Sequence, residues 1–228
     1  MIATPAERSQ GAQNSAYEPL QCAFLSHRRP RRIPMKTQTP FEKALKEFDR
    51  INRQDHRRQR VRGKSYAREL IFAQTVYAWV ERLDASASEA VKLAARSHTL
   101  RRWEVPRDRY RMDAGGYHQW REATAAHSAE AAAAILKRIG YSDPTIREVQ
   151  RIISGLRLPK DPDTQLLEDA DALAFLEIKL GDYVAQWDEV KIRRILEGTW
   201  SKMSSLARQR AAELPLDPRV RMLMTDLK

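Results

Sequence analysis

Apolar residues recur every three or four positions along most of the chain, which is the spacing of helices that bury one face. In the segment 39–52 this stripe consists of Phe41, Leu45 and Phe48. No segment alternates apolar and polar residues as a half-buried strand does, so the pattern predicts an all-α fold, a multi-helix orthogonal bundle of about eight helices. The same spacing predicts the remaining helices over 66–83, 86–103, 117–139, 143–154, 164–180, 183–187, 189–202 and 204–213.

Residues that start or stop helices separate these segments. Ser86-Ala87-Ser88-Glu89 is typical of a capping box, in which two side chains satisfy free backbone N–H groups. Val105-Pro106 ends a helix, because proline disfavours the helical conformation in the residue before it. Gly140 is a natural C-terminal residue, and Asp143-Pro144 supplies a cap and a first turn. These signals place the predicted helix boundaries.

Composition favours one helical domain over residues 37–228. The chain has 228 residues, of which 42% are hydrophobic and only 8 are glycine, so a real core is expected. Residues 1–36 are rich in Ser, Gln, Pro and Arg, which predicts a disordered basic extension. Met35 is an alternative start. Cys22 is the one cysteine, and no apolar run is long enough to cross a membrane, which together predict a cytoplasmic protein without membrane partners.

The net charge of +11 is concentrated near the N-terminus. Residues 50–64 hold seven Lys or Arg and one Asp, whereas residues 65–228 hold 26 basic and 24 acidic residues. A nearly neutral body argues against nucleic-acid binding by the whole domain. The segment 50–64 alone carries enough charge to contact a phosphate backbone, and the alternative is a solvated charge run.

Three residues on separate predicted helices form a candidate metal site. His98, His127 and Asp169 all lie in helical context, and Glu69 is a further candidate. Histidines and a carboxylate that converge from different helices supply the ligands of a divalent ion such as manganese, magnesium or iron. Such an ion would activate a water and polarise a phosphate. The alternative is that these residues are hydrogen-bonded core or groove positions. If these residues hold a metal ion, Glu168 and Asp171 would orient the ligands through hydrogen bonds.

The strings around these residues resemble the HD superfamily of metal-dependent phosphohydrolases. They are Ala94-Ala95-Arg96-Ser97-His98-Thr99, then His127, then Asp169-Ala170-Asp171-Ala172-Leu173. The resemblance implies an HD-like helical bundle and a metal-assisted reaction on a phosphate ester. Thr99 stands where the superfamily has an aspartate, which implies a degenerate enzyme or a binding descendant.

A second resemblance covers residues 40–215. Arg101-Arg102-Trp103-Glu104-Val105-Pro106-Arg107, Gly116-Tyr117-His118-Gln119-Trp120-Arg121 and Leu167-Glu168-Asp169 are similar to strings of an uncharacterised all-helical family found in bacteria and fungi. Some of its members carry a glutamyl-tRNA synthetase-like label. Lys202-Met203-Ser204-Ser205 resembles a class I synthetase loop, but the His-x-Gly-His motif and a Gly-rich phosphate turn are missing. The chain is therefore not expected to be a functional aminoacyl-tRNA synthetase, and we expect Lys202 to close one helix while the serines cap the next.

Arginine and aromatic residues are interleaved between the two histidines. Arg102, Arg107 and Arg121 can clamp a phosphate, and Trp103 and Trp120 can stack on a ring. The group predicts a pocket for an anionic small molecule or nucleotide, and its alternative is a tryptophan-anchored loop with solvated arginines.

Three functions therefore stay open. The first is a degenerate metal-dependent phosphohydrolase or a binder of a nucleotide or phosphate ester. The second is an RNA- or tRNA-associated binding module that uses the segment 50–64. The third is a structural or partner-binding helical protein.

Overall fold

The structure is a computed structural model that describes residues 37–155, 161–225 and 227. The extension predicted over 1–36, with Cys22 and Met35, lies outside the described residues. From Thr37 onward the chain forms one compact unit.

Helices make up 73% of the described chain, so the predicted all-α class is confirmed. The first half contains α1 (Pro40–Asn52), α2 (Arg68–Leu83), α3 (Glu89–Ser97), α4 (Ala114–Ile139) and α5 (Asp143–Ser154). The second half contains α6 (Pro162–Ala174), α7 (Leu180–Gln186), α8 (Glu189–Trp200), α9 (Ser205–Ala212) and α10 (Pro218–Thr225). The π-helical turn η3 (Phe175–Lys179) joins α6 to α7, and two 3-10 turns, η1 (Arg102–Glu104) and η2 (Arg107–Arg109), lead into α4.

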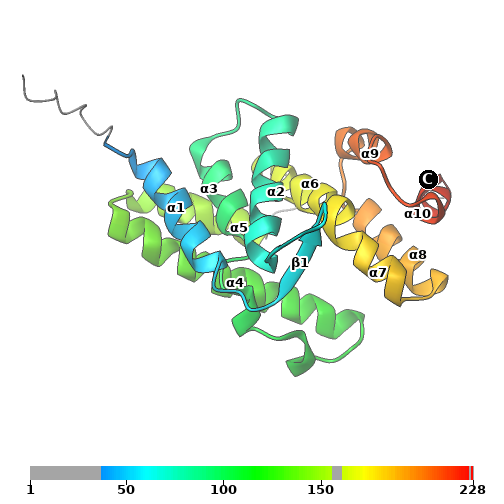
Figure 1. The fold of residues 1–228 in the computed structure, drawn as a ribbon. Helices are drawn as coiled ribbons and strands as arrows, with labels where there is room; N and C mark the ends of the chain where they lie inside the picture. The colour runs from blue at the N-terminus through cyan, green and yellow to red at the C-terminus, as the bar shows by residue number, and fades with distance from the viewer. Residues whose placement is uncertain (1–36, 156–160, 226, 228) are drawn as a thin grey trace, which may run out of the picture. The chain divides into compact units, whose positions relative to one another are not determined.

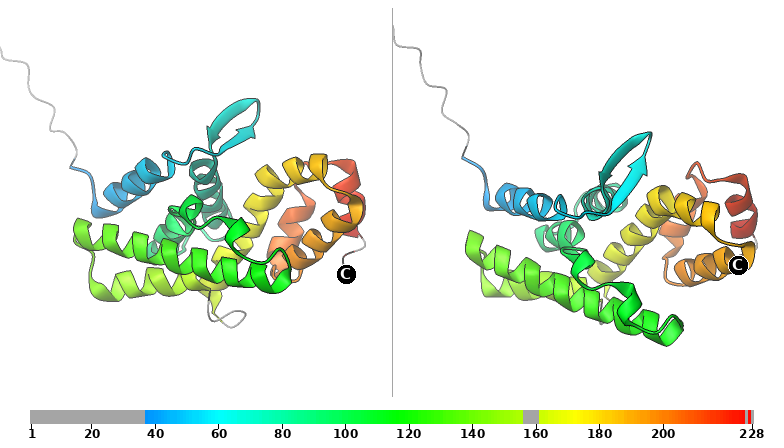
Figure 2. Two further views of the ribbon diagram at one scale, coloured as in Figure 1. Left: turned by 90° about the horizontal axis from the view of Figure 1, so that it is seen from below. Right: turned by 60° about the horizontal axis from the view of Figure 1, so that its bottom comes forward.

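The core lies among α1 to α6. As Figures 1 and 2 show, α4 and α5 run side by side as an antiparallel pair. Helix α3 packs against α5, and α2 packs against α3 and α6. Large apolar side chains from these elements are fully buried, among them Phe48, Phe72, Leu93, Leu136 and Leu173. Within the described residues no helix combines the length and the apolar character needed to cross a membrane.

Local capping explains most helix boundaries. Thr39 and Glu42 close a capping box at the start of α1, and Gly140 ends α4 in the left-handed conformation with φ 101°. At α3 the prediction is wrong by two residues, because Ser88 rather than Ser86 accepts the hydrogen bond from the helix N-terminus, at Val91 N.

Helix α3 also ends at Ser97, six residues before the predicted end at residue 103. The chain turns at Arg101, whose φ is 58°, and the Ser128 hydroxyl on α4 donates to the Leu100 carbonyl at 3.0 Å. This tertiary contact satisfies the Leu100 carbonyl outside helix α3. The early end matters for the site, because the turn carries Arg102 away from the axis of α3.

The segment after α1 forms a β-hairpin, so the prediction of no strands is wrong there. Strand β1 (Arg58–Val61) pairs antiparallel with β2 (Lys64–Ala67). The connecting residues Arg62 and Gly63 both have positive φ, 48° and 78°, as a two-residue type I′ turn requires. Arginine at a positive φ is uncommon, so Arg62 is a weak sequence signal for this turn.

Candidate functional site

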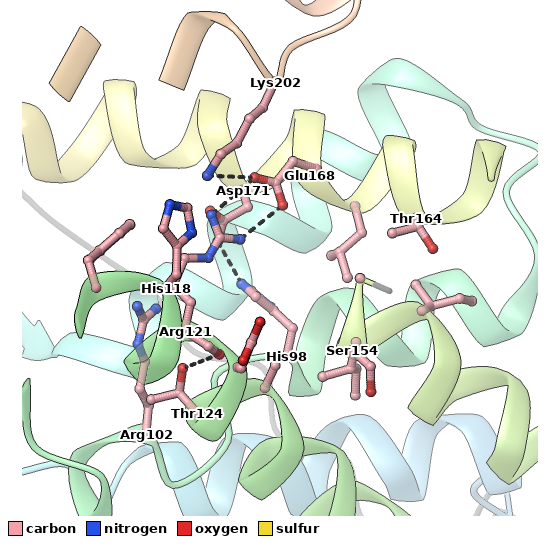
Figure 3. Close-up of a pocket in the computed structure, with 17 residues that line it drawn as sticks. His98, Arg102, His118, Arg121, Thr124, Ser154, Thr164, Glu168, Asp171 and Lys202 are labelled. Atoms are coloured by element: carbon pink, nitrogen blue, oxygen red, sulfur yellow. Dashed lines mark hydrogen bonds and ion pairs between the residues drawn. The ribbon is translucent and has the colours of Figure 1, made fainter. Parts of the chain in front are cut away.

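A cavity of about 310 Å³ opens between α4, the end of α5, α6 and the connection from α8 to α9. We call it the α4–α6 cavity. Figure 3 shows the side chains that converge on it from these elements. Its charged lining residues are His98, Arg102, His118, Arg121, Glu122, Glu168, Asp171 and Lys202. The cavity is therefore polar, with charges of both signs supplied by segments distant in sequence.

Gly116 sets the position of the helix that supplies Tyr117, His118 and Arg121. The Asp113 side chain caps α4 by accepting from Gly116 N at 2.8 Å. A Cβ at Gly116 would lie 2.1 Å from the Arg111 carbonyl oxygen, so the preceding loop can cross the first turn only over glycine. The close crossing brings the first turn of α4 to the rim of the cavity.

Two cations from different elements converge on Glu168. Arg121 on α4 donates to both Glu168 carboxylate oxygens, at 3.2 and 3.0 Å, and Lys202 Nζ lies 3.7 Å from one of them. Although burial opposes the charged guanidinium, Glu168 raises the pKa of Arg121 above its usual value. Burial and the nearby charge of Arg121 lower the pKa of Lys202. One carboxylate thus holds two cations against the cavity (Figure 3).

His98 is held by two acceptors. Its Nδ1 lies 3.0 Å from the Ala95 carbonyl oxygen and its Nε2 lies 2.9 Å from Asp171 Oδ1. Carbonyl and carboxylate oxygens only accept, so both ring nitrogens must carry a proton for both bonds to form. Burial alone would raise the pKa of Asp171, but the hydrogen bond from His98 and the charges of Arg121 and Arg102 hold it well below its usual range. The ring of His98 is therefore held between a carbonyl and a carboxylate at the wall of the cavity.

Arg102 also lines the cavity, but an aromatic ring rather than a carboxylate holds it in place. Its guanidinium carbon lies 4.5 Å from the ring centre of Trp120, whose Nε1 donates to the Val105 carbonyl at 2.8 Å. Within the described residues no carboxylate lies within ion-pair distance of Arg102. Arg102 is thus placed by stacking rather than by a counter-ion, which leaves its N–H groups free for a ligand.

Three residues of the predicted arginine and aromatic group do not line the cavity: Arg107, Trp103 and Trp120. Arg107 donates to the carbonyls of Tyr110 and Asp113, at 3.1 and 3.3 Å, and so fastens the loop before α4. Trp120 supports Arg102 from behind. The tryptophan-anchored loop anticipated as the alternative therefore describes this part of the group.

The proposed metal ligands are not brought together. His127 is partly exposed and its Nε2 lies 3.1 Å from Glu104 Oε2. Asp169 is buried and accepts from Ser204 N at 2.8 Å, from Ser204 Oγ at 2.5 Å and from Gln165. His98 has no lone pair to offer while both of its bonds are kept. These three residues therefore cannot share one ion in this arrangement, and the described residues contain no group of three His, Cys, Asp or Glu side chains placed to hold a metal.

Glu69, the fourth metal candidate, belongs to a buried charge cluster behind the cavity. Arg57 donates to Glu69 Oε1 at 2.8 Å and also pairs with buried Asp55. Lys179, on the turn η3, places its Nζ 3.1 Å from the ring centre of Phe72. Burial lowers the pKa of Lys179 to about 7, although the charge of Glu69 opposes the shift. Single π-helical turns within α-helices are frequent at functional sites.

The residues of the cavity were more predictable from the sequence than their roles. His98, Arg102, Arg121, Glu168 and Asp171 all line it, as members of one predicted region. His118 and Lys202 line it too and were not predicted to do so. Of the synthetase-like string, Ser204 caps α9 as expected by accepting from Ala207 N at 3.2 Å. Lys202 does not close the preceding helix, because α8 ends at Trp200 with Ser201 as its C-cap. The orientation of Lys202 toward Glu168 is a tertiary feature with no local sequence signal.

Comparison with known proteins gives one family. The model of the family described as Domain of unknown function (DUF4202) matches residues 42–224. No curated protein and no solved structure matches the chain. The matched residues include every charged residue that lines the α4–α6 cavity.

Proposed function

The chain belongs to the DUF4202 family of domains of unknown function, and from this premise we propose that its α4–α6 cavity binds a small phosphate-bearing molecule. The observation that carries the proposal is the convergence of Arg102, Arg121 and Lys202 on one cavity from three separate segments. Cations cluster against their mutual repulsion only where other charges compensate them. Glu168 is shared by Arg121 and Lys202, so its single charge does not neutralise both, and Arg102 has no carboxylate partner among the described residues.

The size of the cavity limits the ligand. At about 310 Å³ it lies at the small end of the range of about 300–1,000 Å³ that is typical of ligand pockets. This volume suits a sugar phosphate or a nucleoside monophosphate better than a dinucleotide. Glu122 also lines the cavity, and its carboxylate offers hydrogen bonds to hydroxyl groups of such a ligand.

The proposed function is ligand binding, and it does not require His98 to coordinate a metal. Both ring nitrogens of His98 are engaged by protein oxygens, Nδ1 by the Ala95 carbonyl and Nε2 by Asp171, so His98 serves here to hold the wall of the cavity in place. Arginine forks suit the tetrahedral geometry of a phosphate, and the free fork of Arg102 is the natural first contact.

Calorimetric titration of the full chain tests the proposal. Inorganic phosphate, sugar phosphates and nucleoside monophosphates are compared with their unphosphorylated counterparts. We expect only the phosphorylated molecules to bind. Arg102→Gln should weaken binding about 10- to 100-fold, the range for one charge-assisted hydrogen bond. Arg102 has no carboxylate partner within the described chain, so this change leaves no charge unpaired.

The matched control is Arg147→Gln, which removes the same charge from an exposed position of α5 that does not line the cavity. It should bind as the wild type does. Equal affinity of Arg102→Gln and Arg147→Gln for every phosphorylated ligand would contradict the proposal, as would the absence of any phosphate-dependent binding.

A further inference from the structure

The β-hairpin presents a second cationic surface that is separate from the cavity. Residues 56–67 contain no Asp or Glu, and Arg58, Arg60, Arg62 and Lys64 are all exposed. We call these four residues the basic hairpin. None of them lines the α4–α6 cavity, and the hairpin projects from the helical body in both views of Figure 2. Any function of this surface is therefore independent of the small-molecule site.

The cations of the basic hairpin are unpaired. Across the described part of the chain, no carboxylate lies within ion-pair distance of any of the four. Arg58 donates to the Ser65 carbonyl at 3.0 Å and to its hydroxyl at 3.3 Å, bonds that leave its charge uncompensated. By contrast Arg57, one residue before the hairpin, is paired with Asp55 and Glu69. Carboxylates thus neutralise Arg57 at the base of the hairpin, whereas the four residues of the basic hairpin have no carboxylate partner within the described chain.

The hairpin is held firmly against the helices. The buried Gln59 amide donates to the Ile178 carbonyl and to Asp182 Oδ2, both at 2.9 Å. The Arg68 backbone N–H donates to the Arg57 carbonyl at 2.9 Å and closes the base. Together with the type I′ turn, these bonds fix the spacing of the exposed cations before any partner arrives, which lowers the entropy lost on binding.

We propose that the basic hairpin docks on the phosphodiester backbone of a nucleic acid. Residues two apart on a strand are separated by about 6.6 Å, so Arg58 and Arg60 are spaced much as successive phosphates are along a nucleic-acid strand. Three of the four cations are arginines, whose forks engage phosphate oxygens with two N–H groups. Arg58 and Arg60 share one face of β1, and their fixed spacing suits a repeating polyanion better than the scattered carboxylates of an acidic protein.

The residues at the tip argue against a lipid surface. Membrane-docking segments combine cations with exposed aromatic or aliphatic side chains that enter the acyl boundary. At the tip of this hairpin Arg62, Gly63 and Lys64 are exposed, and Val61 is half-buried. The tip therefore carries positive charge but no exposed apolar side chain that could enter a membrane. Contacts to the backbone of a nucleic acid need only the charge.

The test is the salt dependence of binding by the full chain. Fluorescence anisotropy is measured with labelled single-stranded RNA, single-stranded DNA and duplexes from about 50 to about 200 mM salt. The variant replaces the four residues of the basic hairpin with glutamine. Four lost phosphate contacts should make the slope of log K against log salt shallower by about 3. The wild type should accordingly lose about fiftyfold more affinity across this salt range than the variant does.

A matched control removes the same total charge elsewhere. It replaces four exposed basic residues of the helical body with glutamine: Arg109, Lys137, Arg147 and Arg194. The control should keep the wild-type slope on at least one of the nucleic acids, which supports the proposal. Equal slopes for the hairpin variant and the control overturn it. The proposal is also overturned if the wild type binds no nucleic acid at the lowest salt, whether or not it binds anionic lipid vesicles.

Discussion

Replacing Lys179 with methionine should remove a pH dependence of folding stability. The Lys179 side chain is only 6% exposed, and its ammonium sits over the ring of Phe72. Burial lowers its pKa from 10.5 to about 7, because few polar groups replace the water that the ammonium loses. Glu69 is its main compensating charge. Methionine keeps most of the volume of the side chain and carries no proton to titrate.

The sign and size of the effect follow from proton linkage. Between about pH 7 and pH 10 the unfolded lysine is protonated while the folded one is largely neutral. The unfolded state then binds more protons, so the free energy of unfolding rises with pH. One proton contributes at most about 1.4 kcal/mol per pH unit, and the two pKa values give a gain of about 2–3 kcal/mol between pH 6 and pH 9.

Urea unfolding followed by circular dichroism at several pH values measures this gain. The quantity of interest is the unfolding free energy of the wild type minus that of Lys179→Met, since titration of all other groups largely cancels in the difference. We expect this difference to rise by about 2–3 kcal/mol from pH 6 to pH 9. Lys137→Met, at an exposed position of α4, should give a difference that is flat with pH. A flat difference for Lys179→Met as well would refute the reasoning.

Three further outcomes are expected. Asp169→Ala should lower the free energy of unfolding by about 2–3 kcal/mol in a urea titration, because the start of α9 loses a charged acceptor. Gly116→Ala should lower the midpoint temperature of thermal unfolding and weaken phosphate binding, because its Cβ would lie 2.1 Å from the Arg111 carbonyl oxygen. The matched change Gly181→Ala, whose Cβ would have nothing within 4 Å, should stabilise α7 by about 0.5–1 kcal/mol. Long-range proton–nitrogen NMR spectra should show protons on both ring nitrogens of His98, and on only one of them in Asp171→Asn.

The helix positions were predictable because their signals are local. A cap residue, a proline or a terminal glycine acts within one turn of its own position, as Gly140 does at the end of α4. The hairpin was not predictable in the same way. It depends on a positive φ at Arg62 and on the burial of Gln59 against η3, a contact between residues more than a hundred positions apart. Tertiary contacts of this kind override the weak local preference of the segment.

The predicted metal site failed because of helical geometry. Residues two apart on a helix point about 200° away from each other, so Asp169 and Asp171 cannot both face one cavity. Asp171 faces the cavity and Asp169 faces α9. Similarly, His127 lies six positions after Arg121 on α4, which turns it about 120° away from the cavity side. A stripe of apolar residues marks the buried side of a helix too broadly to resolve such differences.

The ion pairs of the cavity bear on how it would select a ligand. Glu168 is shared by Arg121 and Lys202, and Asp171 is paired with His98, so each of these basic side chains already contacts a carboxylate before a ligand enters. Such pairs keep their side chains in place but attract an anion weakly, because each cation already has a partner. Attraction must then come mainly from Arg102. Its lack of a counter-ion therefore explains why we expect a single substitution there to remove most of the affinity for phosphate, although several other cations line the same cavity.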